Sequence, residues 1–347
     1  MSTPKTAKTS GLKSDDLIVI TGAGGFIAGS LVKYFHDQGF TRIRAVDKKP
    51  LPNWYQRTPG VESICLDVSD DMACRKVCEG AVEVYNLAAD MGGMGFIEHF
   101  RVECLRSILI NTHMIEAAYR AGAQRYFYSS SACAYNTLLQ KDPNCRALKE
   151  TDAYPAMAER GYGWEKLVSE MFCEEYHAER GMNTAIARFH NVYGPNGTWD
   201  GGREKAPAAI CRKVIEAKDN GKHQITIWGD GHQTRSFMYI DDCTKGIDYI
   251  THCEELVAKP INLGSSELVS INELTTLAEN VGGIKLKRDY DLGAPKGVAG
   301  RNSDNTMIQQ ILGWEPNTPL KVGLAKTYAW IEQQFKDRKA GKRTVTD

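Results

Sequence analysis

The chain has 347 residues, enough for one large α/β domain or two smaller ones. Lysine and arginine together number 43, as do aspartate and glutamate, so the formal net charge is zero. This balance argues against nucleic acid or a membrane surface as a partner, and no apolar run approaches the roughly 18 residues of a membrane span.

Residues 1–16 are polar and carry three lysines without an apolar core. We therefore expect a disordered N-terminal tail rather than a secretory signal. The ten cysteines form no C-x-x-C pair, and most lie within apolar stretches. They predict reduced thiols in a cytoplasmic protein and no metal site.

Short apolar runs alternate with helical patterns through the first half of the chain. The predicted strands, rich in β-branched residues, are 17–21, 43–46, 64–66, 82–87, 125–129 and 184–189. Strands separated by helices of this length predict βαβ units and a parallel sheet. Past Asn191 the pattern loosens, and the segments 236–242 and 260–264 are expected to return to the first domain.

A glycine-rich turn, Thr21 to Ala28, joins the first predicted strand to the first helix. Gly22, Gly25 and Ala28 give the spacing G-x-x-G-x-x-A. The first glycine permits a tight turn, the second lets backbone approach a pyrophosphate, and the small third residue packs the helix on the sheet. Free N–H groups at the helix N-terminus would bind phosphate. Such turns also serve as plain loops, but this one lies between a strand and a helix, which predicts a dinucleotide site.

Asp47 ends the second predicted strand. Its carboxylate can accept hydrogen bonds from ribose hydroxyls and would repel a 2′-phosphate, which favours NAD over NADP. It could instead be an exposed turn residue before Lys48 and Lys49. Asp67, after the third strand, could contact the adenine or cap a helix.

Tyr162 and Lys166 lie four residues apart and share one face of a predicted helix. A phenol has a pKa of about 10, so it becomes a useful base only where a cation stabilises the phenolate. Tyr162 could then take a proton from a hydroxyl while hydride leaves the same carbon. A chance Y-x-x-x-K is common, but the glycine turn and the serine run 129–131 make chance a poor explanation.

Over residues 17–335 the chain resembles the extended short-chain dehydrogenases/reductases. The shared motifs are Asn86-Leu87-Ala88-Ala89, residues 191–195, residues 235–242 and Leu312-Gly313-Trp314. Within that family, longer stretches resemble the GDP-mannose 3,5-epimerases: residues 89–96, 130–133, 197–209 and 300–305. The resemblance implies an α/β fold, a Rossmann-type doubly wound parallel sheet with a smaller C-terminal substrate-binding lobe. The NAD-binding domain would be 17–190 with return segments near 236–264, and the lobe would be 191–235 and 265–347.

The implied activity is that of an isomerase that keeps NAD tightly bound. C4 of GDP-mannose is oxidised, C5 and C3 are epimerised and C4 is reduced, giving GDP-L-galactose, or GDP-L-gulose where C5 alone is inverted. The resemblance implies Cys133 and Lys205 as the acid/base pair, with Ser131 beside Tyr162 at the C4 oxygen. A thiol near a cation and a desolvated lysine can both exchange protons near neutrality. Alternatively, Cys133 could be a core cysteine and Lys205 a phosphate-binding or surface lysine.

Further contacts follow from the same resemblance. The expected cofactor contacts are Gly22, Gly25, Phe26, Ile27, Asp47, Asp67, Leu87, Tyr162 and Lys166. The expected substrate contacts are Gly92, Ser131, Cys133, Asn191, Glu204, Lys205, Ala206, Lys213, Gln233, Thr234, Arg235 and Arg301. Arg235 and Arg301 suit a diphosphate, although either could form an ordinary surface ion pair. A homodimer through helices near 108–119 and 166–176 is also implied.

Two features depart from the family pattern: Asn136, where proline is usual, and the stretch 137–146. They concern the wall of the site and not the reacting residues. Three alternatives compete with the 3,5-epimerase. A UDP-sugar 4-epimerase would need no Cys/Lys pair, and a 4,6-dehydratase normally has Asp-Glu where Ala132-Cys133 stands here. A non-catalytic NAD sensor would tend to lose the tyrosine or the lysine.

Overall fold

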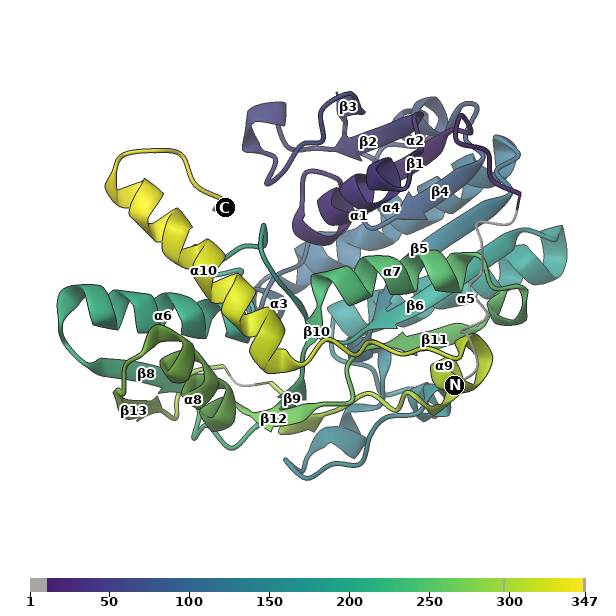
Figure 1. The fold of residues 1–347 in the computed structure, drawn as a ribbon. Coiled ribbons are helices and arrows are strands. Elements are labelled where there is room, and N and C mark those ends of the chain that lie inside the picture. Colours follow the sequence, from purple (N-terminus) through teal and green to yellow (C-terminus); the bar gives the residue numbers. More distant parts are fainter. Residues whose placement is uncertain (1–10, 296, 346–347) are drawn as a thin grey trace.

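The computed structural model describes residues 11–295 and 297–345. Its largest element is a seven-stranded, all-parallel sheet with the order β11-β6-β5-β4-β1-β2-β3 (Figure 1). The strands are β1 (Ile18–Thr21), β2 (Ile43–Asp47), β3 (Glu62–Cys65), β4 (Glu83–Asn86), β5 (Arg125–Ser131), β6 (Asn183–Phe189) and β11 (Pro260–Leu263). The predicted Rossmann-type α/β fold is confirmed.

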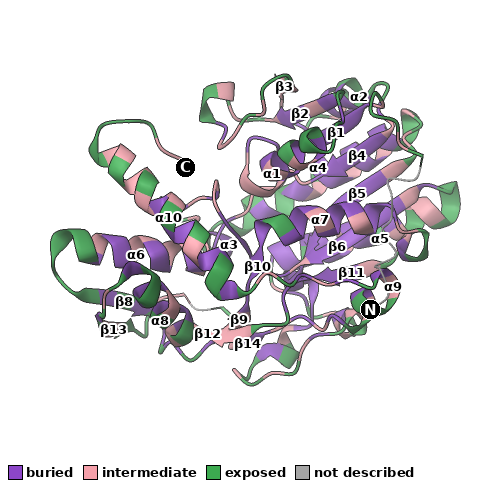
Figure 2. Cartoon of the chain, viewed as in Figure 1, coloured by how far each residue is buried: buried purple, intermediate pink, exposed green. Residues whose placement is uncertain are grey.

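The sheet buries its central strands on both faces, because helices cover each side. Helices α1 (Phe26–Asp37) and α7 (Ile240–Thr251) lie together on one face, and α2 (Asp71–Cys78), α4 (Arg101–Arg120) and α5 (Tyr162–Arg180) cover the other. Figure 2 shows the strands buried and the outer helix surfaces exposed. The strand order changes direction at β1, which has β4 on one side and β2 on the other, and this switch point is where such sheets bind ligands.

A smaller lobe continues from the sheet. Its helices are α6 (Ala206–Asn220), α8 (Ile271–Gly282) and α10 (Leu320–Lys339), which pack on one another (Figure 1). Its strands are β8 (Gln224–Trp228) with β13 (Lys287–Asp291), and β9 (Thr234–Ser236) between β12 (Leu268–Ser270) and β14 (Gly300–Arg301). The short connections are α3 (Met94–His99), α9 (Thr306–Leu312), and the 3-10 turns η1 (Leu51–Asn53), η2 (Ala132–Ala134), η3 (Thr137–Gln140), η4 (Glu150–Ala153) and η5 (Glu254–Leu256).

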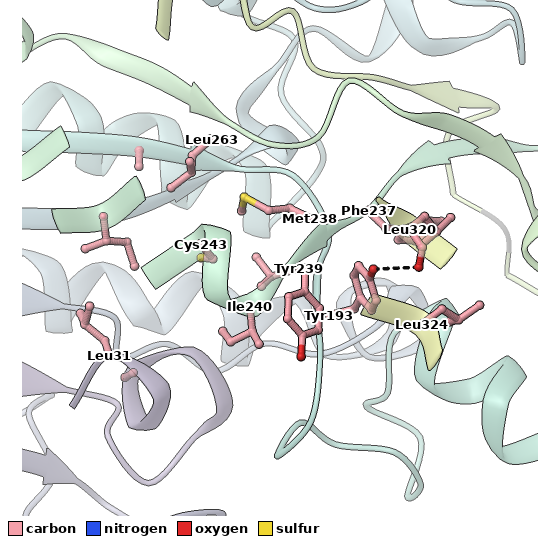
Figure 3. Packing of buried hydrophobic residues seen from close by; sticks show 14 of the residues in the cluster. Leu31, Tyr193, Phe237, Met238, Tyr239, Ile240, Cys243, Leu263, Leu320 and Leu324 are labelled. Carbon is pink, nitrogen blue, oxygen red and sulfur yellow. Dashed lines mark hydrogen bonds between the residues drawn. The ribbon is translucent and has the colours of Figure 1, made fainter. Parts of the chain in front are cut away.

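One apolar core runs without a break from the α1/α7 face of the sheet into the lobe. At the junction, β7 (Val192–Tyr193) pairs with β10 (Met238–Tyr239), and the Tyr193 hydroxyl donates to the Leu320 carbonyl oxygen at 3.3 Å (Figure 3). Gly323 faces the same two tyrosines, because a Cβ there would lie 2.2 Å from the Tyr193 hydroxyl and 2.7 Å from Tyr239 Cδ2. The lobe and the sheet therefore meet through close packing and not through a hinge-like linker.

The two predicted return segments behave differently. Residues 260–264 contain β11, which pairs with β6 in the main sheet. Residues 236–242 do not form a strand of that sheet. They contain β10, which pairs with β7, and the start of α7. Tyr239 is both the last residue of β10 and the N-cap of α7, so the helix begins where the strand ends. The chain thus returns to the sheet as a covering helix first and as an edge strand afterwards.

The first described residues and the C-terminal segment both contact the sheet domain. Residues 1–10 of the predicted tail lie outside the described residues, whereas Ser14 accepts a backbone hydrogen bond from Thr41 at 2.8 Å. At the other end of the chain, α10 ends at Lys339. Trp314 packs edge-to-face on Tyr249 of α7, with ring centroids 5.3 Å apart, which places this part of the 265–347 segment against the sheet. Within 11–295 and 297–345, no helix has the length and apolarity that crossing a bilayer would require.

Candidate active site

The glycine turn lies at the end of β1, at the switch point of the sheet. Gly22 has φ +75°, and a Cβ on it would lie 2.9 Å from the Leu87 carbonyl oxygen, so this position requires glycine. Gly25 is the N-cap of α1, and no side chain of the described residues caps it. The first N–H groups of α1 are therefore available to an anion, as a dinucleotide pyrophosphate requires.

Asp47 adjoins this turn and is half-buried, which contradicts the exposed-turn alternative. Its carboxylate accepts the Gly24 N–H at 3.0 Å and the Lys49 N–H at 2.9 Å. Burial raises the pKa of the Asp47 carboxyl, and these two hydrogen bonds act in the opposite direction. Trp54 and Tyr55 were not predicted, yet the Tyr55 N–H donates to the Gly24 carbonyl oxygen at 3.1 Å. The loop after β2 therefore covers the glycine turn.

Three other predicted cofactor residues differ in their surroundings. Asp67 is exposed and accepts the Ser69 N–H at 2.9 Å, a bond that outweighs its slight burial and lowers its pKa. The cap of α2 is Asp70, so the helix-cap alternative for Asp67 is wrong. Phe26 opens α1, with Ile27 next to it, and a Cβ on Gly197 would lie 3.4 Å from the Phe26 ring. The loop after β7 thus reaches the N-terminus of α1.

Tyr162 and Lys166 occupy the first turns of α5, next to the carboxyl end of β5. Lys166 is 1% exposed, and its ammonium donates to the Ser129 carbonyl oxygen at 3.1 Å and lies 5.4 Å from the Tyr162 ring centroid. Burial raises the pKa of the Tyr162 phenol well above its usual value, while a hydrogen bond with Ser131 lowers it. As a base, Tyr162 thus depends on positive charge nearby.

A ladder of buried polar side chains supports this helix. The Thr21 hydroxyl donates to Asn86 Oδ1 at 2.8 Å, and the Asn86 amide donates to Asn111 Oδ1 at 2.9 Å. The Asn111 amide in turn donates to Glu165 Oε1 and to the Ser169 hydroxyl. Burial raises the pKa of Glu165, whose second oxygen lies 3.7 Å from the Lys166 ammonium. These hydrogen bonds thus connect Thr21, at the start of the glycine turn, to Glu165 in the first turn of α5.

Cys133 lies in the 3-10 turn η2, directly after β5. Its backbone N–H donates to the Ser131 hydroxyl at 3.2 Å, and the Arg301 guanidinium donates to its sulfur at 3.3 Å. It shares a small apolar cluster with Tyr162, Phe96, Ile97 and Cys104. Burial and the carboxylate of Glu159 raise the pKa of the thiol, whereas the Arg301 charge lowers it. The structure therefore places Cys133 beside the tyrosine, in polar contacts that an inert core cysteine does not need.

Lys205 is the N-cap residue of α6 and is half-buried. Burial lowers the pKa of its ammonium, and the nearby Cys133 and Glu159 raise it. Arg301 and Arg235 also act on it. The structure thus brings Lys205 and Cys133, which are far apart in the sequence, into one electrostatic cluster beside Tyr162.

Arg301 differs from its expected setting. It is buried, so the surface ion-pair alternative is wrong: its guanidinium donates to Gln140 Oε1 at 2.6 Å, to Cys133 and to Glu159. These contacts favour a role at the thiol over contact with a diphosphate. Arg235 donates to the Val298 carbonyl oxygen at 2.6 Å, and burial next to Arg301 lowers its pKa to about 10.

The remaining predicted substrate residues form two groups. Near the thiol cluster, the Gly93 N–H donates to the Arg203 carbonyl oxygen at 3.0 Å, which holds the loop of Gly92 against Glu204, Lys205 and Ala206. Asn191 is bonded to the Ser236 carbonyl oxygen and Thr234 to that of Pro143.

The second group lies around Trp228 in the lobe. Lys213 donates to the Thr226 carbonyl oxygen at 2.7 Å, and its ammonium lies 5.7 Å from the Trp228 ring centroid. The Gln233 amide donates to the Trp228 carbonyl oxygen at 2.7 Å. Trp228 itself is exposed and was not predicted, because an isolated tryptophan before a glycine gives no sequence signal.

Two further residues of the thiol cluster were also missed. Glu159 precedes Tyr162 by three residues and belongs to no recognised motif. Gln140 lies in the stretch 137–146 that departs from the family pattern, and that departure was the available signal. Gln140 and Glu159 together hold the guanidinium of Arg301.

A glycine turn at the switch point of the sheet, with a buried Tyr/Lys pair beside it, is typical of Rossmann-class enzymes that use a nicotinamide cofactor. The chain belongs to the NAD dependent epimerase/dehydratase family, whose model matches residues 18–264. It is 44% identical over 324 residues to the GDP-mannose 3,5-epimerase of Arabidopsis thaliana, covering 93% of this chain and 84% of that one. It is 43% identical to GDP-mannose 3,5-epimerase 1 of Oryza sativa subsp. japonica, covering 93% and 83%. The UDP-glucose 4-epimerase of Thermotoga maritima shares the fold, with a TM-score of 0.80 at 21% identity over 92% of this chain and 99% of that one.

Proposed function

We propose that the chain epimerises GDP-mannose at C3 and C5 through transient oxidation of C4, forming GDP-L-galactose. The relatives with this activity are 44% and 43% identical over nearly the whole chain. The structural observation that supports the proposal is the position of Cys133, which lies beside Tyr162, accepts a hydrogen bond from Arg301 and feels the charge of Lys205. A 4-epimerase or a cofactor sensor has no use for a second acid/base pair there.

The residues at the switch point fit a dinucleotide. The uncapped N-terminus of α1 and the glycine turn would hold the pyrophosphate, and the Asp47 carboxylate would select NAD by its ribose. Lys166 and Tyr162 would hold the nicotinamide riboside end. When bound, NAD supplies a reversible two-electron oxidation at the substrate carbon.

The side chains then have separate tasks. Tyr162 takes the C4 hydroxyl proton and returns it at the end, with Lys166 and Ser131 stabilising its phenolate. The C4 carbonyl acidifies the protons at C3 and C5. Cys133 and Lys205 remove and replace these protons from opposite sides of the ring, and Arg301 stabilises the thiolate form of Cys133. The group around Trp228, with Lys213 and Gln233, is assigned to the nucleotide end of the substrate.

The decisive experiment is incubation with GDP-mannose in D2O, followed by NMR of the recovered sugar nucleotide. We expect deuterium at C3 and C5. Cys133→Ala should abolish this exchange while the cofactor stays bound, because Cys133 lies outside the glycine turn. Solvent exchange at neither carbon in the unsubstituted enzyme would refute the 3,5-epimerase, and inversion at C4 alone would indicate a 4-epimerase instead.

We also propose a homodimer formed through α4 and α5. Both helices present exposed apolar side chains on the surface away from the sheet, namely Val102, Leu105, Leu109, Trp164 and Met171. Light scattering should give twice the chain mass, and a monomer at micromolar concentration would contradict the proposal. The ten free thiols support a reducing compartment, for which we propose the cytoplasm.

A further inference from the structure

Glu159 is a carboxylate that none of the proton transfers above uses. Its Oε2 lies 3.3 Å from the Arg301 guanidinium, which also donates to the Cys133 sulfur at 3.3 Å. Its backbone N–H also donates to the Cys133 carbonyl oxygen at 3.0 Å. Although burial opposes ionisation, the charges of Arg301 and Lys205 hold its pKa below the usual value. Glu159 is therefore an ionised carboxylate that shares the Arg301 guanidinium with the Cys133 thiol.

The proposed reaction creates a need for such a group. In each inversion one member of the Cys133/Lys205 pair takes a proton from carbon and the other gives a proton to carbon. The pair ends with its two protonation states exchanged, so it cannot repeat the same step. Two inversions that both take the proton from the same face of the ring therefore require a proton to return from one member to the other between them.

The surroundings of Glu159 suit that transfer. The Arg301 guanidinium and a backbone hydrogen bond hold it next to Cys133, and its charge also acts on Lys205. It also lines a pocket of about 270 Å³, together with Met94, Ile97 and Glu98 from α3 and Val298 from the lobe. A polar pocket of this size has room for several waters. Glu159 thus lies next to Cys133 and also lines a space where water can carry a proton.

We propose that Glu159 returns the proton between Cys133 and Lys205 after each inversion, an inference that rests on the proposed function. The protonated member gives its proton to the carboxylate, which becomes a carboxylic acid. The acid then gives that proton to the deprotonated member, directly or through water in the pocket. One O–H bond forms and breaks at Glu159, no electrons are transferred, and the carboxylate ends as it began.

The test compares the two products in a single turnover with enzyme in excess over GDP-mannose. Glu159→Gln keeps the volume and an oxygen that accepts the hydrogen bond from Arg301, but it cannot take up a proton. The first inversion should proceed, and the second should slow on the order of a hundredfold, as expected when a proton-transfer group is lost. The singly inverted 5-epimer should accumulate. Glu98→Gln, a carboxylate change in the same pocket, should leave the product ratio unchanged.

A second variant separates proton transfer from structural support. In Glu159→Ala the pocket extends to the thiol, and added formate should restore the second inversion by acting as the missing carboxylate. An unchanged product ratio in Glu159→Gln would overturn the proton-return role, as would an equal loss of both products that formate fails to restore in Glu159→Ala. Formation of neither epimer by the unsubstituted enzyme would instead refute the proposed function.

Discussion

Gly323→Ala tests how tightly the lobe is fastened to the sheet. Alanine is favoured over glycine within a helix by about 1 kcal/mol. Here, however, the new methyl group would lie 2.2 Å from the Tyr193 hydroxyl and 2.7 Å from Tyr239 Cδ2, so side chains must move. Overpacking of this kind costs about 1–3 kcal/mol, and loss of the hydrogen bond from Tyr193 to Leu320 adds about 1 kcal/mol. The packing cost wins, and we expect a net destabilisation of about 1–3 kcal/mol.

The assay is urea unfolding, followed by circular dichroism, of four variants: Gly323→Ala, Tyr193→Phe, the two combined, and Ala329→Gly. Ala329→Gly, at an exposed position of the same helix, measures the helix propensity term without a packing change. Tyr193→Phe combined with Gly323→Ala removes the nearest clashing atom, so it should be less destabilised than the sum of the single changes. If Gly323→Ala instead raised the free energy of unfolding by about 1 kcal/mol, propensity alone would govern and the packing argument would be refuted.

Three further outcomes follow from the site and the core. Tyr162→Phe should lower turnover on the order of 10²–10⁴-fold, with no reduced cofactor detectable by absorbance; undiminished turnover would exclude its role as base. Asp47→Asn should shift the preference from NAD toward NADP by at least about tenfold in Kd, because it removes the charge that repels a 2′-phosphate; an unchanged ratio by titration would contradict this. Hydrogen bonds to Asp248 and Glu83 outweigh burial and raise the pKa of His252 to about 10. The stabilisation from protonated His252 is complete below the unfolded pKa of about 6.5 and is lost as the pH rises through 10. Between these pH values, the unfolding midpoint of His252→Gln should therefore vary less with pH than that of the unsubstituted protein.

The strands and the reacting helix could be predicted from local sequence, because buried parallel strands are continuous apolar runs. The strand ends were less predictable. The predicted fifth strand ends at Ser129, whereas β5 continues through Ser131, whose backbone pairs with Phe189 of β6. Three polar serines carry no apolar signal, and only the partner strand determines how far the pairing extends.

The thiol cluster shows where local reasoning stops. Arg301 contacts Cys133 across 168 positions of sequence, and its bond to Gln140 spans 161. Periodicity describes neighbours on one element, so it cannot indicate which arginine meets which cysteine when the lobe packs on the sheet. Family resemblance selected Arg301, but its partners Gln140 and Glu159 became evident only from the packing.

The polar ladder from Thr21 through Asn86 and Asn111 to Glu165 has a mechanical consequence. It ties the cofactor turn to the first turns of α5 through α4, so these segments should open together as one cooperative unit in amide hydrogen exchange. The same α4 carries the exposed apolar side chains of the proposed dimer face. Association of two subunits would then stiffen the helix that bears Asn111, and each subunit would slow local opening at the hydride-transfer site of its neighbour.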